Sequence, residues 1–143
     1  MSNTANTSTT SLSATARKLL DGRSCAVLAT LNADGSPQTS VVWVAREGDE
    51  LLISTQAGRA KEKNMRRDPR VSLCIYDVAD SDNYLEVRGR ATITEDEGRK
   101  VAVALAEKYE GPGAGEEYLN LPAKDVRLTV RITPTRVVGS AAK

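Results

Sequence analysis

Strict alternation over Tyr84 to Thr94 is the feature of this sequence that most limits its possible folds. Every second residue of YLEVRGRATIT is apolar or glycine, and the intervening residues are polar, charged or tyrosine. A period of two residues is typical of a β-strand with one buried face and one face towards solvent or a partner. A slip of one residue would bury the charged face, so the register is fixed. We therefore expect a core built around a sheet.

Other stretches of strand length support an all-β framework. Ser24–Leu31 is apolar on both faces, as in a strand near the centre of a sheet, and Asp125–Thr133 alternates strictly. Pro134 then permits only an edge strand or a bulged continuation. Short turns join 24–31, 37–46 and 50–55, which predicts an antiparallel meander of three strands. A further strand is expected at 71–76, and Asp77–Asn83, rich in Asp and Ser, is expected as a loop.

Helices are expected between the strands. Ser13 is a suitable N-cap for a helix over 14–20, and Asp68-Pro69 ends a second helix that covers 60–67. Thr94 and Glu97 have the spacing of a capping box, which predicts a third helix to about 109, and 115–121 can form a short helical turn. The sequence thus predicts a mainly β protein, a barrel of six or seven strands with three or four short helices.

Length and composition narrow the organisation and the partners. At 143 residues the chain is expected to be one domain, residues 12–143, after a flexible tail of residues 1–11 rich in Ser, Thr and Asn. Cys25 and Cys74 lie in apolar runs without metal-ligand spacing, so both are predicted to be reduced core residues of a cytoplasmic protein. No apolar run approaches the roughly eighteen residues of a membrane span. A net charge of +1 argues against a nucleic-acid partner.

Histidine is absent from the chain. This absence excludes imidazole-based catalytic triads and the metal sites that depend on histidine, so no metal site is expected. Any chemistry must then come largely from a cofactor.

The segment Leu51–Arg70 joins an apolar strand to a strongly basic helix. Six Lys or Arg between Gly58 and Arg70 face only two acidic residues, a local charge of +4. A helix N-terminus favours an anion, and Arg59 can offer a two-pronged donor set beside the compact charge of Lys61. Ser54 and Thr55 add neutral donors. The pattern indicates a phosphate site, with an ordinary solvated basic face as the alternative.

Three motifs resemble one known family. They are ATLNADGSPQ at 29–38, RAK at 59–61 and NMRRDPR at 64–70. Together they resemble the pyridoxamine-phosphate-oxidase-like split-barrel family, and specifically its branch that uses the deazaflavin coenzyme F420. The resemblance runs from about Leu19 to Ser140. It implies an FMN-binding type of split β-barrel that forms a homodimer, with the cofactor between the protomers.

The resemblance also implies which residues contact the cofactor. Gln38 and Ser40 would lie beside the ring, although ordinary polarity inside the barrel would also explain them. Val41 stands where several relatives carry a polar residue and can offer only backbone groups. The expected cofactor-binding set is Gln38, Ser40, Val41, Ser54, Thr55, Arg59, Lys61, Asn64, Asn83 and Tyr84. Asn64 would assist the phosphate or an anionic tail, or would be a plain surface residue.

Asn83 and Tyr84 would reach the cofactor from the second protomer, or Tyr84 would only pack at the dimer seam. No catalytic residue is assigned. The implied function is transfer of a hydride from reduced coenzyme F420 to a small unsaturated substrate. FMN is the alternative cofactor, and a non-catalytic flavin- or haem-binding module is the alternative of another class. The loop at 111–115 would be either a lid or a simple helix end.

Overall fold

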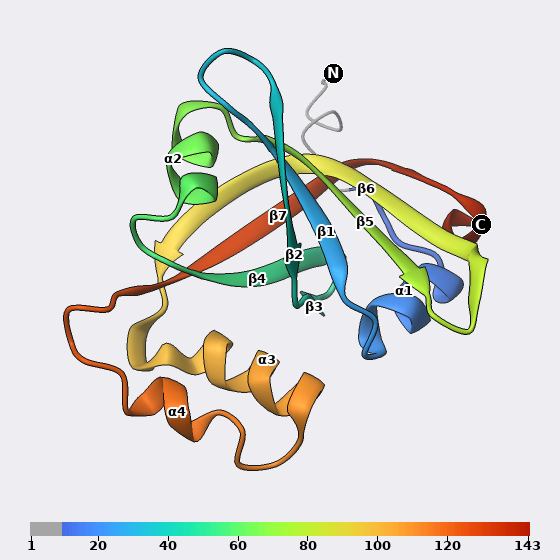
Figure 1. The fold of residues 1–143 in the computed structure, drawn as a ribbon. Helices are drawn as coiled ribbons and strands as arrows, with labels where there is room; N and C mark the ends of the chain where they lie inside the picture. Colours follow the sequence, from blue (N-terminus) through green and yellow to red (C-terminus); the bar gives the residue numbers. More distant parts are fainter. Residues whose placement is uncertain (1–9) are drawn as a thin grey trace, which may run out of the picture.

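Residues 10–143 are described by a computed structural model, in which seven strands form one antiparallel sheet. The order of the strands is β2-β1-β5-β6-β7-β4-β3, and the sheet curls into a barrel (Figure 1). The strands are β1 (Ala26–Leu31), β2 (Pro37–Val42), β3 (Ala45–Glu47), β4 (Glu50–Gln56), β5 (Arg70–Asp77), β6 (Asp80–Glu95) and β7 (Arg127–Val138). The predicted mainly β class with up to seven strands is confirmed. Most of the predicted tail, residues 1–9, lies outside the described residues.

The two edge strands of the sheet, β2 and β3, are neighbours in the chain. Only Trp43 and Val44 separate them. Three Cα steps of 3.8 Å span at most about 11 Å, so the edges can be joined this way only if the sheet curls until they nearly meet. The barrel is therefore closed at this seam by the chain itself and not by a ladder of hydrogen bonds.

The predicted meander of three strands is wrong, because the expected strand 37–46 breaks in two. β2 pairs with β1, whereas β3 pairs with β4. At the break, the backbone N–H of Val44 donates to Tyr109 Oη at 3.1 Å. The carbonyl oxygen of Val44 accepts from Lys108 Nζ at 2.6 Å. Side chains of a distant helix thus satisfy backbone groups that a continuous strand would have used.

Alternation along β6 is confirmed, and it defines the inside of the barrel. Leu85 and Val87 are fully buried and Ala91 is nearly so. The interior is filled mainly by aliphatic side chains, including Leu28, Leu51, Ile53, Leu73, Ile75, Val130 and Ile132.

The prediction of two core cysteines is wrong, since both are exposed. Cys74 lies between the buried Leu73 and Ile75, so the pleat directs it to the outer face.

β6 begins earlier in the chain than predicted, and a bulge interrupts its pairing with β7. The predicted loop 77–83 is too long, because β6 already begins at Asp80. Asp77 and Asp80 accept from the backbone N–H groups of Ala79 and Asp82, at 2.9 and 3.1 Å, and these local turns start the hairpin. The bulge expected at Pro134 is confirmed: the register between β6 and β7 shifts at this point.

Between residues 10 and 143, four helices and two 3-10 turns pack around the barrel. They are α1 (Ala14–Asp21), α2 (Ala60–Arg67), α3 (Lys100–Glu110), α4 (Glu116–Leu119), η2 (Glu97–Arg99) and η3 (Ser140–Ala142). Ser13 caps α1 as predicted, accepting from the N–H of Ala16 at 3.1 Å. Across residues 10–143, no helix has the length and apolar character of a membrane-crossing segment.

The predicted capping box of Thr94 and Glu97 is wrong. The carboxylate of Asp96 instead accepts from the N–H groups of Val101 at 3.0 Å and Ala102 at 2.9 Å. Asp96 is buried, and α3 starts at Lys100 after the turn η2. Asp96, two residues after Thr94, therefore accepts hydrogen bonds from the backbone N–H groups at the first turn of α3, as the capping box was expected to do.

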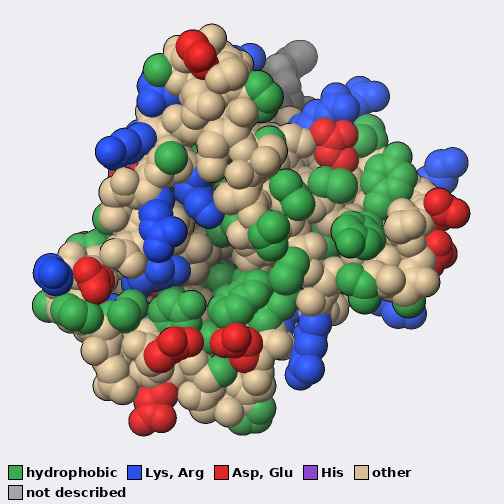
Figure 2. Space-filling view, viewed as in Figure 1, with side chains coloured by type: hydrophobic (Ala, Val, Ile, Leu, Met, Phe, Trp, Pro, Cys, Tyr) green, Lys and Arg blue, Asp and Glu red, His purple; other side chains and the backbone are tan. Residues whose placement is uncertain are grey.

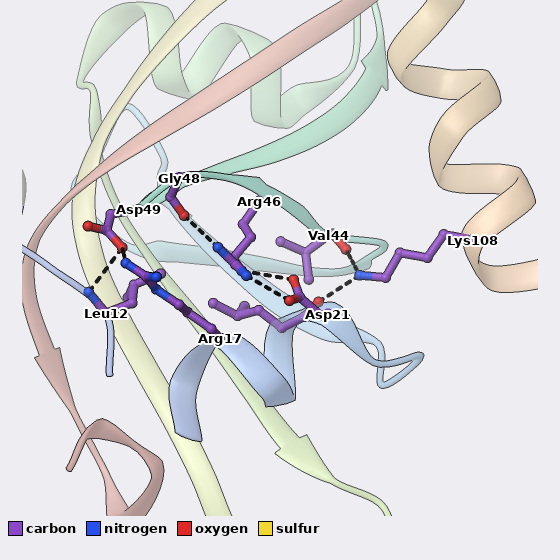
Figure 3. A network of polar contacts seen from close by, with 9 residues as sticks. Leu12, Arg17, Asp21, Val44, Arg46, Gly48, Asp49 and Lys108 are labelled. Carbon is purple, nitrogen blue, oxygen red and sulfur yellow. Dashed lines mark hydrogen bonds and ion pairs between the residues drawn. The ribbon is translucent and has the colours of Figure 1, made fainter. Parts of the chain in front are cut away.

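A polar network fixes α1 and α3 against β3 (Figure 3). Arg46 forms a two-pronged pair with Asp21, with both contacts at 2.8 Å. Lys108 of α3 donates to the carbonyl oxygens of Leu20 and Val44, both at 2.6 Å. The Lys108 contacts hold α3 at the seam of the barrel, whereas the Arg46–Asp21 pair joins α1 to β3.

Candidate functional site

A pocket of about 210 Å³ lies where the end of β2, β4 and the start of α2 meet α3 and α4. Lys and Arg side chains gather on this face in the hollow between α2 and the layer of α3 and α4 (Figure 2). The pocket is lined by Val41, Val42, Trp43, Ser54, Lys61, Ala102, Leu105, Tyr118 and Arg127. Three of the residues predicted from the sequence, Val41, Ser54 and Lys61, are thus brought together.

Local chemistry between β4 and α2 puts Lys61 at this pocket. Gly58 has a φ of 97°, a conformation that favours glycine, and it turns the chain from β4 into the helix. The helix begins at Ala60, so Lys61 lies in its first turn. Glu62 accepts from the Gly58 N–H at 2.6 Å and pairs with Arg66 at 2.7 Å, so its carboxylate is already engaged. Lys61 is half-buried, and Arg59 just before the helix is exposed.

Arg127, the first residue of β7, is a member of the site that sequence reasoning missed. Its Nη2 donates to Ser54 Oγ at 2.8 Å, and its guanidinium lies over the ring of Tyr118, 5.2 Å from the centroid. Its Nε is buried without a hydrogen-bond partner among the described residues. In the sequence Arg127 is only one of the alternating polar residues of a strand, and the pairing of β4 with β7 brings it to Ser54.

The cations at this pocket lack counter-ions. Within the part of the chain that the structure describes, no carboxylate forms an ion pair with Arg59, Lys61 or Arg127. Burial lowers the pKa of Lys61, and the charges of Arg59 and Arg127 lower it further. Burial also lowers the pKa of Arg127. An anion in the pocket would relieve this repulsion, and the start of α2 adds its own positive potential.

Gln38 and Ser40 share one face of β2, outside the lining of the pocket. Thr30 Oγ1 donates to Gln38 Oε1 at 2.8 Å, and the Gln38 amide donates to the carbonyl oxygen of Thr39 at 3.3 Å. The Oγ of Ser40 is buried and has no hydrogen-bond partner among residues 10–143. Val41 on the opposite face lines the pocket and is 69% exposed.

Thr55 and Asn64 are directed away from the pocket. Thr55 is buried on the face of β4 opposite to Ser54. Asn64 is 4% exposed, and its Nδ2 donates to Thr30 Oγ1 and Asn32 Oδ1, both at 3.0 Å. Asn64 thus anchors α2 to β1 and the turn after it.

Asn83 and Tyr84 lie near the C-terminus of the chain, remote from α2. The backbone N–H of Tyr84 donates to Ser140 Oγ at 3.0 Å, and Asn83 lines a different cavity beside α1. Within one chain they do not contribute to the pocket that contains Lys61.

Hydrophobic side chains are exposed on the outer face of β2, β1, β5 and β6. Val41, Val27 and Cys74 are register partners across three neighbouring strands, and Tyr76 is the partner of Tyr84. Val27 is 41%, Tyr76 48% and Tyr84 42% exposed. We call these five residues the outer apolar row. An exposed apolar patch of this kind is typical of an interaction surface.

Comparison with known proteins agrees with the fold. The sequence profile of the pyridoxamine 5'-phosphate oxidase family matches residues 12–139. An F420 reductase of known structure is 30% identical with a TM-score of 0.74, over 85% of this chain and 94% of that one. A conserved hypothetical protein from Mycobacterium tuberculosis is 28% identical with a TM-score of 0.72, over 96% of this chain and 88% of that one.

General stress protein 26 from Bacillus anthracis str. Sterne shares the fold at 23% identity. Its TM-score is 0.62, and the match covers 84% of this chain and 86% of that one. A family profile that spans nearly all the described residues, together with the seven-stranded barrel, establishes the relationship. The chain belongs to the pyridoxamine 5'-phosphate oxidase family of flavin-binding, split-barrel oxidoreductases.

Proposed function

We propose that this protein is an oxidoreductase that uses reduced coenzyme F420 to reduce a small unsaturated substrate. One observation carries the proposal: Arg59, Lys61 and Arg127 form a cation cluster with no carboxylate partner among the described residues. Such a cluster at the start of a helix suits a phosphate.

The donor set fits the phosphate of a flavin or a deazaflavin. Lys61 and Arg127 would contact it from inside the pocket, and Arg59 from the exposed start of α2. The Nε of Arg127 is a buried donor in need of an acceptor. When bound, the reduced deazaflavin supplies the hydride, which the protein itself cannot provide. The chain's own residues bind the anion, orient the ring and exclude water.

The choice of coenzyme F420 over FMN is supported by the similarity to the F420 reductase. Coenzyme F420 carries a tail of glutamates beyond its phosphate. Arg66 and Arg70 already pair with Glu62 and Asp68, whereas Arg59 has no ion-pair partner among residues 10–143. Arg59 is exposed at the start of α2 and would attract such a tail. FMN, with a single phosphate, needs only the cations at the pocket.

We also propose that the site is completed in a homodimer. The pocket of about 210 Å³ is smaller than the roughly 300–1,000 Å³ that ligand pockets usually span. The outer apolar row includes Val41, which also lines the pocket, so a second copy on this row would lie beside the ligand. Tyr84, remote from the pocket in its own chain, would reach the partner's ligand in this way.

Titration of the purified protein with oxidised coenzyme F420 and with FMN, followed by ligand fluorescence, tests the proposal. We expect saturable binding of coenzyme F420, and oxidation of the reduced form when an unsaturated acceptor is added. Tighter binding of FMN, or a yellow protein after purification, would identify FMN and not the deazaflavin as the cofactor. Binding without turnover over a broad panel of acceptors would favour a module that stores or senses the cofactor. Failure to bind either molecule would overturn the proposal.

A further inference from the structure

Arg99 makes an unusual set of contacts outside the pocket. Its guanidinium donates to four backbone carbonyl oxygens: those of Tyr118 at 2.9 Å, Leu121 at 2.6 Å, Pro122 at 2.7 Å and Asp125 at 3.2 Å. No carboxylate pairs with it among residues 10–143. All the donors that it uses are thus directed at one segment, residues 118–125, which leads from α4 into β7.

The backbone of Arg99 has a conformation that serves this contact. Its φ of 56° and ψ of 31° are left-handed, and it is the one non-glycine residue between 10 and 143 with a positive φ. This region is unfavourable for an arginine, and such a conformation persists only where surrounding contacts hold it. Four charge-assisted hydrogen bonds are contacts of that kind.

The backbone hydrogen bonds of segment 118–125 itself are local, as from the N–H of Asn120 to Glu116 and from that of Asp125 to Pro122. Asn120 and residues 122–124 are exposed, and a cavity of about 400 Å³ lies between this segment and η2. Few buried apolar contacts mean a low local stability unless polar contacts compensate. The bonds from Arg99 therefore restrain the path of the chain from Tyr118 to Asp125. Beyond this segment the backbone is held by other elements, since the N–H groups of Ala57 and Asp96 donate to the carbonyl oxygens of Val126 and Arg127, both at 2.9 Å.

The residue that begins this segment and the residue two positions after its end both belong to the pocket. Tyr118 and Arg127 line it, and the guanidinium of Arg127 lies over the Tyr118 ring at 5.2 Å. The guanidinium of Arg127 has no counter-ion, is half-buried and donates a hydrogen bond to Ser54. A cation held in place before the ligand arrives loses less entropy when the anion binds.

We propose that Arg99 is a positioning residue of the anion site: by restraining segment 118–125, it holds Arg127 and Tyr118 in their ligand-binding arrangement. The inference rests on the proposed function only in that the anion is taken to be the phosphate of a flavin or deazaflavin. Arg99 itself does not line the pocket and acts through Arg127.

The first test is a titration with coenzyme F420 and FMN of Arg99→Asn, Arg127→Gln and the double variant. Asn tolerates the left-handed backbone but is too short to reach the carbonyls. We expect Arg99→Asn to weaken binding about tenfold, the effect of losing one charge-assisted hydrogen bond. The double variant should bind no more weakly than Arg127→Gln alone, since residues that act through one another are not additive. Additive losses would overturn the inference.

A matched control separates positioning from general stability. Arg46 also holds a backbone carbonyl, that of Gly48 at 3.0 Å, together with Asp21, but away from the pocket. Arg46→Gln should lower the melting temperature and leave the affinity unchanged. Arg99→Lys, which can restore part of the contact, should recover part of the affinity. If Arg99→Asn lowers only the melting temperature, as Arg46→Gln does, Arg99 is merely structural.

A second test needs no cofactor, so it remains decisive if the proposed function fails. Trp43 is the only tryptophan of the chain and lines the same pocket. Iodide, an anion, should quench its fluorescence more efficiently relative to neutral acrylamide when the cations are in place. We expect Arg127→Gln and Arg99→Asn to lower this ratio alike, and Arg46→Gln to leave it unchanged. A ratio that falls in Arg127→Gln but stays at the wild-type value in Arg99→Asn would overturn the inference.

Discussion

The ammonium nitrogen of Lys108 lies 2.6 Å from the carbonyl oxygen of Val44, the residue at which β2 and β3 separate. The same ammonium reaches the carbonyl oxygen of Leu20, also at 2.6 Å. One side chain of α3 thus joins α1 to the seam of the barrel. Burial lowers the pKa of Lys108, and the nearby charge of Asp21 offsets part of this effect.

Replacing Lys108 with Met should therefore destabilise the fold. Met keeps most of the aliphatic stem and removes hydrogen bonds from a charged donor, so the free energy of unfolding should fall by about 1.5–3 kcal/mol. Denaturant unfolding measures the change. Lys100→Met, at the exposed start of the same helix, is the control and should change the stability little. Equal stability of the two variants would show that the Lys108 contacts contribute nothing.

Replacing Lys61 with Ala should weaken cofactor binding without loss of stability. Removal of a charge-assisted contact to a phosphate costs roughly 1.5–3 kcal/mol, or about ten- to a hundred-fold in affinity. Because Arg59 and Arg127 repel Lys61 in the free protein, the melting temperature should stay constant or rise. Titration with coenzyme F420 or FMN at one salt concentration, with thermal melts alongside, tests both statements.

Two further variants decide whether the cluster is a defined site. Arg59→Lys should also weaken binding, since an ammonium cannot reproduce a two-pronged contact. Lys63→Ala should bind almost normally, because Lys63 is exposed and does not line the pocket. Equal and modest losses in all three variants would indicate diffuse attraction to a basic surface.

Cofactor affinity should fall at alkaline pH. The pKa of Lys61 in the free protein is lowered from its usual 10.5, first by burial and then by Arg59 and Arg127. A bound anion stabilises the protonated form and raises that pKa, so binding takes up protons between the two values. The affinity is therefore complete below the pKa of the free protein and declines as the pH rises above it.

The matched variant for this pH profile is Lys61→Arg, which stays charged over the same range. Its affinity should be nearly independent of pH where that of the wild type declines. Titrations from pH 7 to 10.5 at constant ionic strength would show the difference. The same decline in both proteins would assign the titration to another group.

Asp96 should matter more for α3 than either residue of the capping box expected from the sequence. Asp96→Ala removes the acceptor for two N–H groups at the start of the helix, at a cost of about 0.5–2 kcal/mol. Glu97 is exposed, so Glu97→Ala should have little effect. Thermal unfolding of the two variants compares them directly. A larger loss of stability in Glu97→Ala than in Asp96→Ala would support the capping box instead.

The outer apolar row should carry the dimer contact. Val27→Glu places a charge between Val41 and Cys74 and should give a folded monomer. Val78→Glu, at a residue that is 78% exposed and outside the row, should remain a dimer. Light scattering, with circular dichroism as a check of folding, measures both. A wild-type protein that is monomeric at micromolar concentration would refute the proposed dimer.

Local signals in the sequence predicted local structure well. The alternation of β6, the Ser13 cap and the bulge at Pro134 each depend on residues close together in the chain. The basic helix was also placed correctly at 60–67. In each case the nearby residues decide the backbone conformation by themselves.

Apart from the capping box at Thr94 and Glu97 and the loop at 77–83, which failed on local contacts, long-range contacts account for the predictions that were wrong. The expected strand 37–46 is interrupted at Val44, where Tyr109, 65 residues later, binds the backbone N–H. Arg127 joins the site because it contacts Ser54, 73 residues earlier. The exposure of Cys74 depends on which face of β5 lines the barrel, and a short apolar run does not reveal this. Such pairings are decided by the packing of the whole chain.

The seam between β2 and β3 also bears on self-association through strand edges. An open sheet presents two rows of unpaired backbone groups, to which a strand of another molecule can add. Here the edges are short, since β3 has three residues and β2 has six. Because Trp43 and Val44 draw the two edges together, each edge limits access to the other. The two-residue connection that closes the barrel thereby leaves little space for a foreign strand, so chain connectivity adds to the protection that the short edges give against fibril-like growth.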